Sequence, residues 1–324
     1  MNIISKVIGC GAYLLENVVT NEDLAKQVDT SDEWIVSRTG IRQRHIVQDG
    51  EMTSDLAYQA AKRAVKDAGI EQQDIDLIVV GTTTPDDTFP AAAVKVQSRL
   101  GLTGGAAFDV QAACSGFIYA LSVADSMIRA GQIKTAIVIG ADTLSKLLNW
   151  QDRTTCVLFG DGAGAVVLQA QSPNGDPAPK GILSTHLHSD GNLRNILYCE
   201  SDLVAGVGSR VIRMDGREVF KHAVTNLASV VIEALEANGL RDTDIDWLVP
   251  HQANKRIIDS TAKKLKMSDD KVVLTIANHA NTSAASIPLA LDAAIKDGRI
   301  QPGNLLLMEA MGGGLTWGAA LVRW

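Results

Sequence analysis

Cys114 stands at a junction where a cysteine can act as a nucleophile. Residues 106–110 read as a short buried strand, and residues 117–128 carry apolar side chains at helical spacing until Gly131 ends the run. The thiol would face the first turn of a helix, where free N–H groups and the helix dipole lower the pKa of a thiol. A buried structural cysteine is the alternative, because free cysteine is among the most buried residue types. Small neighbours favour a substrate site: Ala112, Ala113, Ser115 and Gly116.

An internal repeat organises the rest of the chain. Gly69 and Gly239 each precede a strand segment that begins Asp-Ile-Asp, and their positions in the sequence differ by an offset of 170. Gly131 and Gly298 each end a helical run, and the offset between them is 167. Repeated units of this size indicate that one supersecondary arrangement occurs twice in the chain.

The repeat predicts which polar residues meet Cys114. An offset of 167 pairs Cys114 with Asn281, and an offset of 170 pairs Gly81, just past a strand end, with His251. Ligands of open α/β sheets gather at the carboxyl ends of strands, so the three side chains are expected to converge. Taken singly, a histidine at a strand end and an asparagine at a helix N-terminus are also common structural residues.

The composition restricts the class of protein. Of the 324 residues, 46% are hydrophobic and 21% are charged, which suits a globular chain of one large or two ordinary domains. Four cysteines without paired spacing indicate a reducing compartment, and we expect a cytoplasmic protein with no signal peptide and no membrane span. The net charge of −7 disfavours nucleic acid as a partner.

One proline-rich segment, residues 171–180, separates the two copies of the repeat. Each copy alternates strands and helices in a βαβα order, which is typical of a buried sheet covered by helices. The sequence therefore predicts an α/β protein with an N-terminal half over residues 1–172 and a C-terminal half over residues 173–324. Cys114 belongs to the first half, and His251 and Asn281 belong to the second.

Four ordered motifs carry a resemblance to a known family. They read Ala-Ala-Cys-Ser-Gly-Phe from Ala112, Val-Pro-His-Gln-Ala-Asn from Val249, Asn-Thr-Ser-Ala-Ala-Ser from Asn281 and Gly-Gly-Gly-Leu-Thr-Trp-Gly from Gly312. Together they resemble β-ketoacyl-acyl-carrier-protein synthase III, the initiating condensing enzyme of bacterial fatty-acid synthesis, over essentially the whole chain. The resemblance implies a thiolase-like fold, in which two halves related by a pseudo-twofold axis form a layered α-β-α-β-α sandwich.

The resemblance also implies a reaction. A short acyl group, expected to come from acetyl-CoA, would pass to Cys114 and then be condensed with malonyl-acyl-carrier protein as CO₂ leaves. His251 and Asn281 would serve decarboxylation, and the N–H groups of Cys114 and Gly313 would form an oxyanion hole. Cysteine suits acyl transfer between thioesters, and neutral histidine and asparagine can donate to an enolate oxygen. No cofactor and no metal is expected, because coenzyme A arrives as the substrate thioester.

The same resemblance implies residues that hold coenzyme A. Trp34 would stack on the adenine, and Arg38 and Arg153 would contact the nucleotide end. Stacking and cationic contacts suit an adenine that carries phosphates. Asn254 would bind the pantetheine arm, and Phe220 would lie near the mouth of the tunnel.

Phe89 lies on a loop directly before Pro90. It resembles the residue that crosses a homodimer interface and closes the floor of the partner's acyl pocket, so a bulky ring there implies a short primer. Two positions depart from the pattern of relatives. Arg217 stands where asparagine is common, and Ala280 stands where glycine is frequent.

Basic residues gather after the His251 motif on an otherwise acidic chain. A helix expected over residues 257–265 would project them to one side. The resemblance suggests acyl carrier protein, which is strongly acidic, as the partner of this face. A solvated helix face is the alternative. The residues predicted to contact the carrier protein are Gln252, Arg256, Lys263 and Lys264.

Other functions compete with this interpretation. A relative within the superfamily could condense other acyl groups for secondary metabolism or carry out thiolysis. A biosynthetic thiolase would be expected to have a second reactive cysteine near its C-terminus, and no cysteine follows Cys199. A non-catalytic scaffold that binds a carrier protein would not need Cys114, His251 and Asn281 together.

A possible metal site is a weaker alternative. His186, His188 and Asp190 alternate along one strand and would share a face. No further set of ligands accompanies them, so a structural role is favoured.

Overall fold

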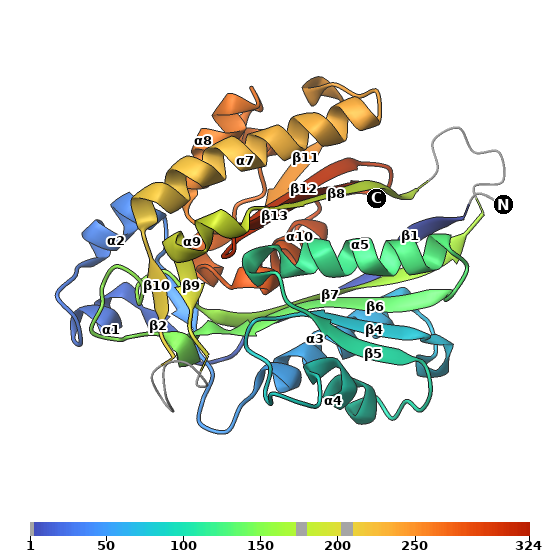
Figure 1. Ribbon diagram of the computed structural model, residues 1–324, viewed down its shortest axis with the longest axis horizontal. Helices are drawn as coiled ribbons and strands as arrows, with labels where there is room; N and C mark the ends of the chain where they lie inside the picture. Colours follow the sequence, from blue (N-terminus) through green and yellow to red (C-terminus); the bar gives the residue numbers. More distant parts are fainter. Residues whose placement is uncertain (1–2, 173–179, 202–209) are drawn as a thin grey trace.

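The computed structural model describes residues 3–172, 180–201 and 210–324. Helices and strands are mixed along its whole length (Figure 1). Before the proline-rich segment lie β1 (Ile4–Tyr13), β2 (Val18–Thr20), α1 (Asn21–Ala25), α2 (Asp32–Thr39), β3 (Gln43–His45), α3 (Thr53–Ala68), β4 (Leu77–Gly81), α4 (Ala92–Arg99), β5 (Ala106–Val110), α5 (Gly116–Arg129), β6 (Thr135–Thr143) and β7 (Asp161–Gln171). After it lie β8 (Gly181–Ser189), β9 (Leu197–Cys199), β10 (Ile212–Met214), α7 (Gly216–Ala237), β11 (Trp247–Pro250), α8 (Lys255–Lys264), α9 (Ile276–His279), α10 (Ser286–Lys296), β12 (Leu305–Gly312) and β13 (Thr316–Arg323).

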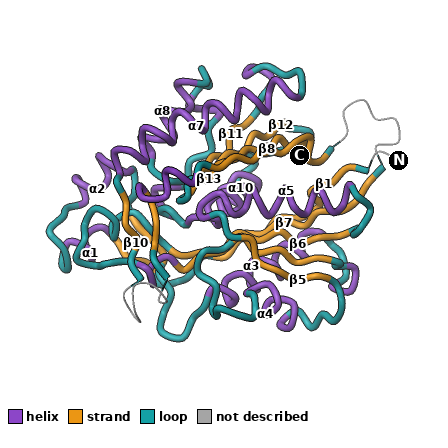
Figure 2. Tube along the Cα trace, viewed as in Figure 1, coloured by secondary structure: helices purple, strands orange, loops and turns teal. Residues whose placement is uncertain are grey.

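Two large sheets form the frame of the described chain. The first has the order β1-β7-β6-β4-β5, with β4 parallel to both β5 and β6. The second has the order β11-β12-β13-β8, with β11 parallel to β12. Helices α5 and α10 lie between the sheets, α3 and α4 cover the outer face of the first, and α7 and α8 cover the outer face of the second (Figures 1 and 2). The predicted α-β-α-β-α layering of a thiolase-like fold is confirmed.

Apolar burial holds these layers together. Phe117 and Leu121 on α5 share one core with Ile287 and Leu291 on α10, together with strands of both sheets. A second core joins α3 and α4 to the first sheet, and a third joins α7 and α8 to the second. Both central helices are therefore largely buried, as the apolar run after Cys114 indicates, although Ser126 and Arg129 near the end of α5 are exposed.

The repeat is visible in the strand register. Strands β4 and β6 pair Val79 with Val138, and β11 and β12 pair Val249 with Met308, which is the same pairing at an offset of 170. The short 3₁₀ turns before the central helices, Ala113–Ser115 and Ser283–Ala285, are related by the same offset. Each begins with a non-glycine residue at positive φ, at 46° and 51° respectively, so the two turns share an uncommon backbone conformation.

The predicted pairing of Cys114 with Asn281 is therefore wrong. The residue equivalent to Cys114 is Ala284, at the middle of the second turn. Helix α5 has 14 residues and α10 has 11, so the offset changes from 170 to 167 within the central helices, after both turns. Asn281 still lies close to the turn, because it precedes it by two residues.

Three further expectations need correction or remain open. Strand β5 is an edge strand and only partly buried, rather than buried, because β4 is its single neighbour. The strand expected at residues 272–276 is reduced to one bridge between Leu248 and Val272, and α9 begins at Ile276. Most of the proline-rich segment 171–180 lies outside the described residues, so the domain boundary stays a prediction. Among the described residues, no helix has both the length and the apolar character needed to cross a membrane.

Candidate active site

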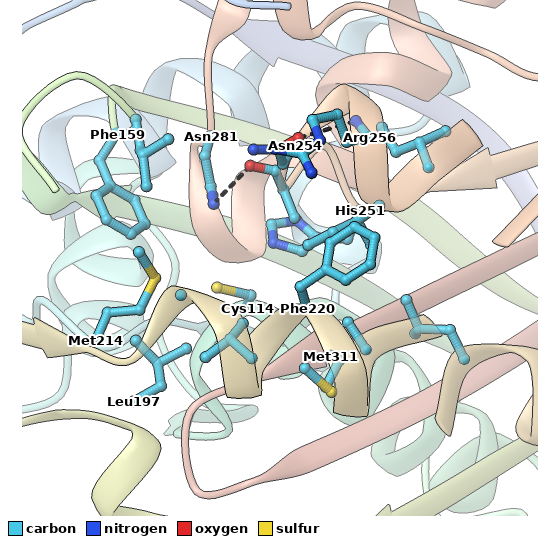
Figure 3. Close-up of a pocket in the computed structure, with 18 of the residues that line it drawn as sticks. Cys114, Phe159, Leu197, Met214, Phe220, His251, Asn254, Arg256, Asn281 and Met311 are labelled. Atoms are coloured by element: carbon cyan, nitrogen blue, oxygen red, sulfur yellow. Dashed lines mark hydrogen bonds between the residues drawn. The ribbon is translucent and has the colours of Figure 1, made fainter. Parts of the chain in front are cut away.

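Cys114, His251 and Asn281 line one cavity of about 410 Å³ beneath α7 and α8 (Figure 3). Cys114 also lines a second cavity of about 500 Å³, which includes Gly313 and Ser283. The thiol thus lies where two cavities adjoin. A group that enters from one side can react at sulfur while its substituent occupies the other.

The chain places Cys114 by a sharp turn between β5 and α5. Ala113 adopts a φ of 46°, and the N-terminus of α5 begins at Gly116, two residues after the cysteine. Burial nevertheless raises the pKa of the Cys114 thiol to about 12. The prediction of a lowered pKa is wrong, because loss of water around sulfur outweighs the hydrogen bonds with the Ser283 side chain and the Cys114 backbone, which act to lower the pKa. The resting residue is a neutral thiol.

His251 follows the end of β11, and its backbone N–H donates to the carbonyl of Glu309 at 2.8 Å. The ring is buried and faces the cavity beside Cys114 (Figure 3). Its Nδ1 lies 2.6 Å from the Ser286 hydroxyl. Burial lowers the pKa of the imidazole to about 3, so the ring is neutral at neutral pH. A neutral ring can donate one hydrogen bond without carrying charge.

Asn281 is fixed at both ends of its amide. Its Oδ1 accepts from the Ser283 backbone N–H at 2.9 Å, and its Nδ2 donates to the carbonyl of Ala253 at 3.4 Å. The backbone of Asn281 also pairs with Leu158 and Gly160 in the adjoining segment. These contacts set the orientation of the amide, so a remaining N–H of Nδ2 is available to the cavity that Asn281 lines.

The glycine run at residues 312–314 brings backbone close to Cys114. A Cβ on Gly312 would lie 2.6 Å from the backbone nitrogen of Cys114, and one on Gly313 would lie 2.8 Å from the carbonyl oxygen of Leu197. Any side chain there would displace backbone, so glycine is required for this approach. Gly313 and Cys114 line the same cavity, the one that extends away from His251.

The mouth of the first cavity is lined by Phe220, Asn254, Arg256 and Arg217. The guanidinium of Arg256 lies 5.7 Å from the centre of the Phe220 ring. Asn254 caps α8, since its side-chain oxygen accepts from the Arg256 backbone N–H at 2.8 Å. The amide nitrogen of Asn254 remains free to donate to a ligand in this arrangement.

Trp34, Arg38 and Arg153 form a separate cluster on the surface. The guanidinium carbons of Arg38 and Arg153 lie 4.5 Å and 5.2 Å from the centre of the Trp34 ring. Gly40 ends α2 and lies against the side chain of Lys255 at the start of α8. The cluster is therefore next to the helix that borders the cavity mouth, although none of its three residues lines the cavity.

Arg256, Lys263 and Lys264 are exposed on α8, as the sequence predicts. Gln252 is different, because its side chain is 0% exposed. Its amide donates to the carbonyls of Pro250 and Val273 and accepts from the N–H groups of Thr275 and Ile276. A direct side-chain contact between Gln252 and a carrier protein is therefore excluded. Gln252 holds the loop that precedes α8.

Phe89 is not part of either cavity. Its side chain is 84% exposed, on the loop between β4 and α4. Asp86 anchors that loop, since its carboxylate accepts from the N–H and hydroxyl of Ser54 at 2.9 and 2.6 Å. The aromatic ring thus stands out from a loop that is itself held in place.

The histidines of the possible metal site have another partner. His186 Nδ1 and His188 Nε2 lie 3.0 Å and 2.6 Å from the two carboxylate oxygens of Glu233 on α7. The carboxylate of Asp190 accepts from the Asn192 backbone N–H instead. Within the described ranges, no cluster of three such side chains could hold a metal ion.

Sequence reasoning missed two residues of the site. Glu309 on β12 lines the cavity with His251, is 1% exposed, and has an Oε2 without a hydrogen-bond partner among the described residues. Burial raises the pKa of its carboxyl to about 8. The available signal was a charged residue within the apolar run of residues 305–311. Ser286, the second, has no local signal, because its partner His251 is 35 residues away.

Comparison with known proteins places this site in a family. A model described as 3-oxoacyl-(acyl-carrier-protein) synthase III matches residues 108–191, and the model of its C-terminal part matches residues 235–324. β-Ketoacyl-(acyl-carrier-protein) synthase III of Rhodospirillum centenum is 63% identical over 324 residues and covers 100% of both chains. The enzyme of the same name from Paramagnetospirillum magneticum is 63% identical over 323 residues, again with 100% of both chains covered.

Solved structures agree with these relatives. The 3-oxoacyl-(acyl-carrier-protein) synthase III of Aquifex aeolicus superposes with a TM-score of 0.92 at 49% identity, covering 99% of this chain and 100% of the other. The enzyme from Pseudomonas aeruginosa gives a TM-score of 0.93 at 43% identity, covering 99% and 98%. With its cysteine, histidine and asparagine on one cavity of a thiolase-like fold, the chain belongs to the β-ketoacyl-acyl-carrier-protein synthase III family.

Proposed function

We propose that this chain carries out the initiating condensation of fatty-acid synthesis, joining an acyl-CoA primer to malonyl-acyl-carrier protein to give a 3-ketoacyl-acyl-carrier protein. The observation that carries the proposal is the position of Cys114 between two cavities, with His251 and Asn281 beside it on one of them. The identity of 63% to synthases III, against 33% to a priming β-ketosynthase of a polyketide pathway, favours fatty-acid synthesis over secondary metabolism.

The first half-reaction is acyl transfer to Cys114. Its sulfur attacks the thioester carbonyl of the acyl-CoA, a new C–S bond forms, and the bond to the coenzyme A sulfur breaks. The proton of the thiol ends on coenzyme A, so the step is balanced without another reactant. The backbone N–H of Cys114, with that of Gly313, is the proposed donor pair for the carbonyl oxygen, since the glycine run lies against the Cys114 backbone.

The second half-reaction uses the other two side chains. The malonyl thioester loses CO₂, and the electrons of that C–C bond form an enolate whose oxygen takes one hydrogen bond from His251 and one from Asn281. The enolate carbon then attacks the acyl group, a C–C bond forms, and the Cys114 sulfur leaves as a thiolate that takes up a proton from water. Neutral donors suit this step because they stabilise a developing charge inside a buried cavity.

Coenzyme A is proposed to bind from the surface cluster at Trp34 through the cavity mouth toward the Cys114 thiol. Trp34, with Arg38 and Arg153 against its ring, is proposed to hold the adenine nucleotide of coenzyme A. The pantetheine arm would pass Phe220 and the amide nitrogen of Asn254 at the cavity mouth. Aromatic and amide groups match the apolar and amide segments of that arm.

The second cavity is the proposed acyl pocket, with acetyl as the preferred primer. Its walls include the apolar side chains of Leu144, Leu147 and Ile212. We propose that a second copy of the chain completes it, through the exposed ring of Phe89. Full burial of such a ring contributes roughly 1.5 to 3 kcal/mol, which favours the homodimer.

Acyl carrier protein is the proposed partner of the exposed face of α8. Arg256, Lys263 and Lys264 extend from this helix, whose first turn lies at the cavity mouth. A cationic surface there would orient an acidic carrier protein so that its pantetheine arm enters the cavity. Cys10, Cys114 and Cys156 are free thiols, as suits the proposed cytoplasmic location.

Mass spectrometry of the acyl-enzyme tests the proposed function. The purified chain is incubated with acetyl-, butyryl-, isobutyryl- and hexanoyl-CoA, its intact mass is recorded, and the modified cysteine is located by digestion. We expect one acyl group on Cys114, most rapidly from acetyl-CoA, and none on the partly exposed Cys199. The variant Cys114→Ser should show no thioester. Acylation elsewhere, or none with any primer, would contradict the proposal.

A further inference from the structure

The Ser286 hydroxyl is the hydrogen-bond partner of the His251 ring. It lies 2.6 Å from Nδ1, at the first residue of α10, and it is buried with the ring. The same oxygen accepts from the backbone N–H of Gln252 at 3.3 Å. Ser286 therefore contacts the histidine from behind, on the side of the ring away from Nε2.

The Ser286 hydroxyl can donate one hydrogen bond. The group that accepts this bond decides which ring nitrogen of His251 carries hydrogen. Among the described residues, Nδ1 is the only acceptor with which the Ser286 hydroxyl forms a hydrogen bond. If Nδ1 carried the proton, this oxygen would accept two bonds and its own O–H would be left without a partner in a buried site, which is unfavourable. If Nδ1 accepts instead, every group is satisfied, and the ring proton resides on Nε2.

We infer that Ser286 is a positioning residue that sets the Nε2–H tautomer of His251, so that the neutral ring donates a hydrogen bond into the cavity. This inference deepens the proposed function and rests on it, because the enolate oxygen is what such a donor would stabilise. With the other tautomer, the ring would present a lone pair to the enolate and repel it. Ser286 itself touches no reacting atom.

The repeat supports this role. At the offset of 170, the residues equivalent to His251 and Ser286 are Gly81 and Gly116. Those two glycines pack backbone against backbone, since a Cβ on Gly81 would lie 2.5 Å from the carbonyl carbon of Gly116. The frame therefore tolerates a pair without polar side chains at this position. The hydrogen-bonded pair of the C-terminal half is not a requirement of the fold.

Nitrogen NMR of the wild-type chain reads the tautomer directly. In a sample with ¹⁵N-labelled histidine, long-range ¹H–¹⁵N spectra distinguish a protonated Nε2 from a protonated Nδ1, and His251→Gln identifies the resonances. We expect protonated Nε2. A protonated Nδ1 would overturn the inference. This result does not depend on catalysis, so it holds or fails separately from the proposed function.

Kinetics of Ser286→Ala provide the second readout. We expect decarboxylation of malonyl thioester to slow by roughly 10- to 100-fold in kcat, less than the loss of a whole oxyanion donor, with little change in KM. Acylation of Cys114 should stay within about twofold, because the acyl carbonyl uses backbone donors. Ser286→Thr, which keeps the hydroxyl, should recover most of the decarboxylation rate.

Ser5→Ala is the matched control, since it removes a buried hydroxyl that has no hydrogen-bond partner among the described residues. It should leave both half-reactions unchanged. Equal losses of acylation and decarboxylation in Ser286→Ala, or a decarboxylation rate equal to wild type, would overturn the inference. A wild-type chain that neither acylates Cys114 nor decarboxylates malonyl thioester would instead contradict the proposed function.

Discussion

His251 and Ser286 occupy the same places in the C-terminal half as Gly81 and Gly116 occupy in the N-terminal half. In the first half the two positions bring a strand end and a helix start into backbone contact. In the second half they carry an imidazole and a hydroxyl 2.6 Å apart. The same frame thus serves close packing on one side of the axis and polar chemistry on the other.

At a second pair of equivalent positions, the glycine is in the C-terminal half and the polar side chain is in the N-terminal half. Gly312 leaves space in front of the Cys114 backbone nitrogen, whereas its equivalent Asp142 accepts a hydrogen bond from the Ala284 backbone N–H at 3.2 Å. One turn therefore presents its N–H to a cavity, and the matching turn has it bonded to a carboxylate. The proposed nucleophile thus lies on the turn of the half in which no side chain fills this position.

The largest expected effects come from removing the donors of the C-terminal half. His251→Ala and Asn281→Ala should each lower decarboxylation of malonyl thioester by roughly 10²- to 10³-fold, as is typical for loss of one oxyanion donor. Acylation of Cys114 should continue, because its proposed donors are backbone groups near Gly312. Release of labelled CO₂ and intact mass measure the two steps. Loss of acylation with decarboxylation retained would reverse the assigned roles.

The contact between Gly81 and Gly116 in the N-terminal half should be sensitive to added side-chain volume. A Cβ at Gly81 would meet the Gly116 backbone, so Gly81→Ala should lower the free energy of unfolding by about 1 to 3 kcal/mol, as overpacking does. Gly191→Ala is the control, because a Cβ there meets nothing within 4 Å. Urea denaturation measures both variants. Equal stability of the two would mean that the Gly81 contact relaxes without cost.

Sequence patterns predicted the repeated βαβα order and the place of Cys114 because both depend on local spacing, whereas the five-layer arrangement was implied by the family resemblance. Apolar residues at helical spacing and the repeated Asp-Ile-Asp segments identify which strands and helices recur. The same patterns gave a wrong partner for Cys114, since the shorter second helix shifts the offset only beyond the turn. Periodicity does not reveal at which point of the buried helix α10 becomes shorter than α5.

The remaining errors concern burial, which no local pattern reports. The Cys114 thiol has a raised pKa because burial removes water from around its sulfur. Gln252 stands beside exposed basic residues in the sequence, yet its amide is enclosed by four backbone groups. Ser286 meets His251 only when a strand end and a helix start from different segments come together.

The buried carboxyl of Glu309 should make the stability of the folded chain depend on pH. Its equivalent in the first half is the apolar Ile139, and burial raises the pKa of Glu309 from 4.5 to about 8. Between these values the folded state keeps a proton that the unfolded state has released, so stability falls as pH rises. Glu309→Gln should remove this fall, with a gain over wild type that grows by of order 1 kcal/mol per pH unit.

Urea denaturation of wild type and Glu309→Gln at pH 5, 6.5 and 8 measures this gain. A constant difference over the range would mean that Glu309 is already ionised in the folded chain. Glutamine keeps the shape of the side chain, so a cavity does not complicate the comparison.

The connections after the equivalent strands β4 and β11 differ as well. The first carries the exposed ring of Phe89, and the second carries the basic helix α8. If Phe89 closes the acyl pocket of a second copy, Phe89→Ala should enlarge that pocket. The ratio of kcat/KM for hexanoyl-CoA over acetyl-CoA should then rise by roughly tenfold, within the range for pocket contacts. Ile232→Ala, another exposed apolar residue, is the control. An unchanged ratio would place Phe89 elsewhere.

The smallest effect is expected on α8. Lys263 is exposed, and within the described chain no ion pair engages it. An exposed pair contributes at most about 1 kcal/mol, so Lys263→Glu should raise KM for malonyl-carrier protein roughly two- to fivefold at low salt. The increase should shrink at about 0.5 M salt, where screening is stronger, and KM for acetyl-CoA should not change. Lys62→Glu on α3 makes the same change on the other half, and an equal increase there would mean that the carrier protein responds to net charge rather than to α8.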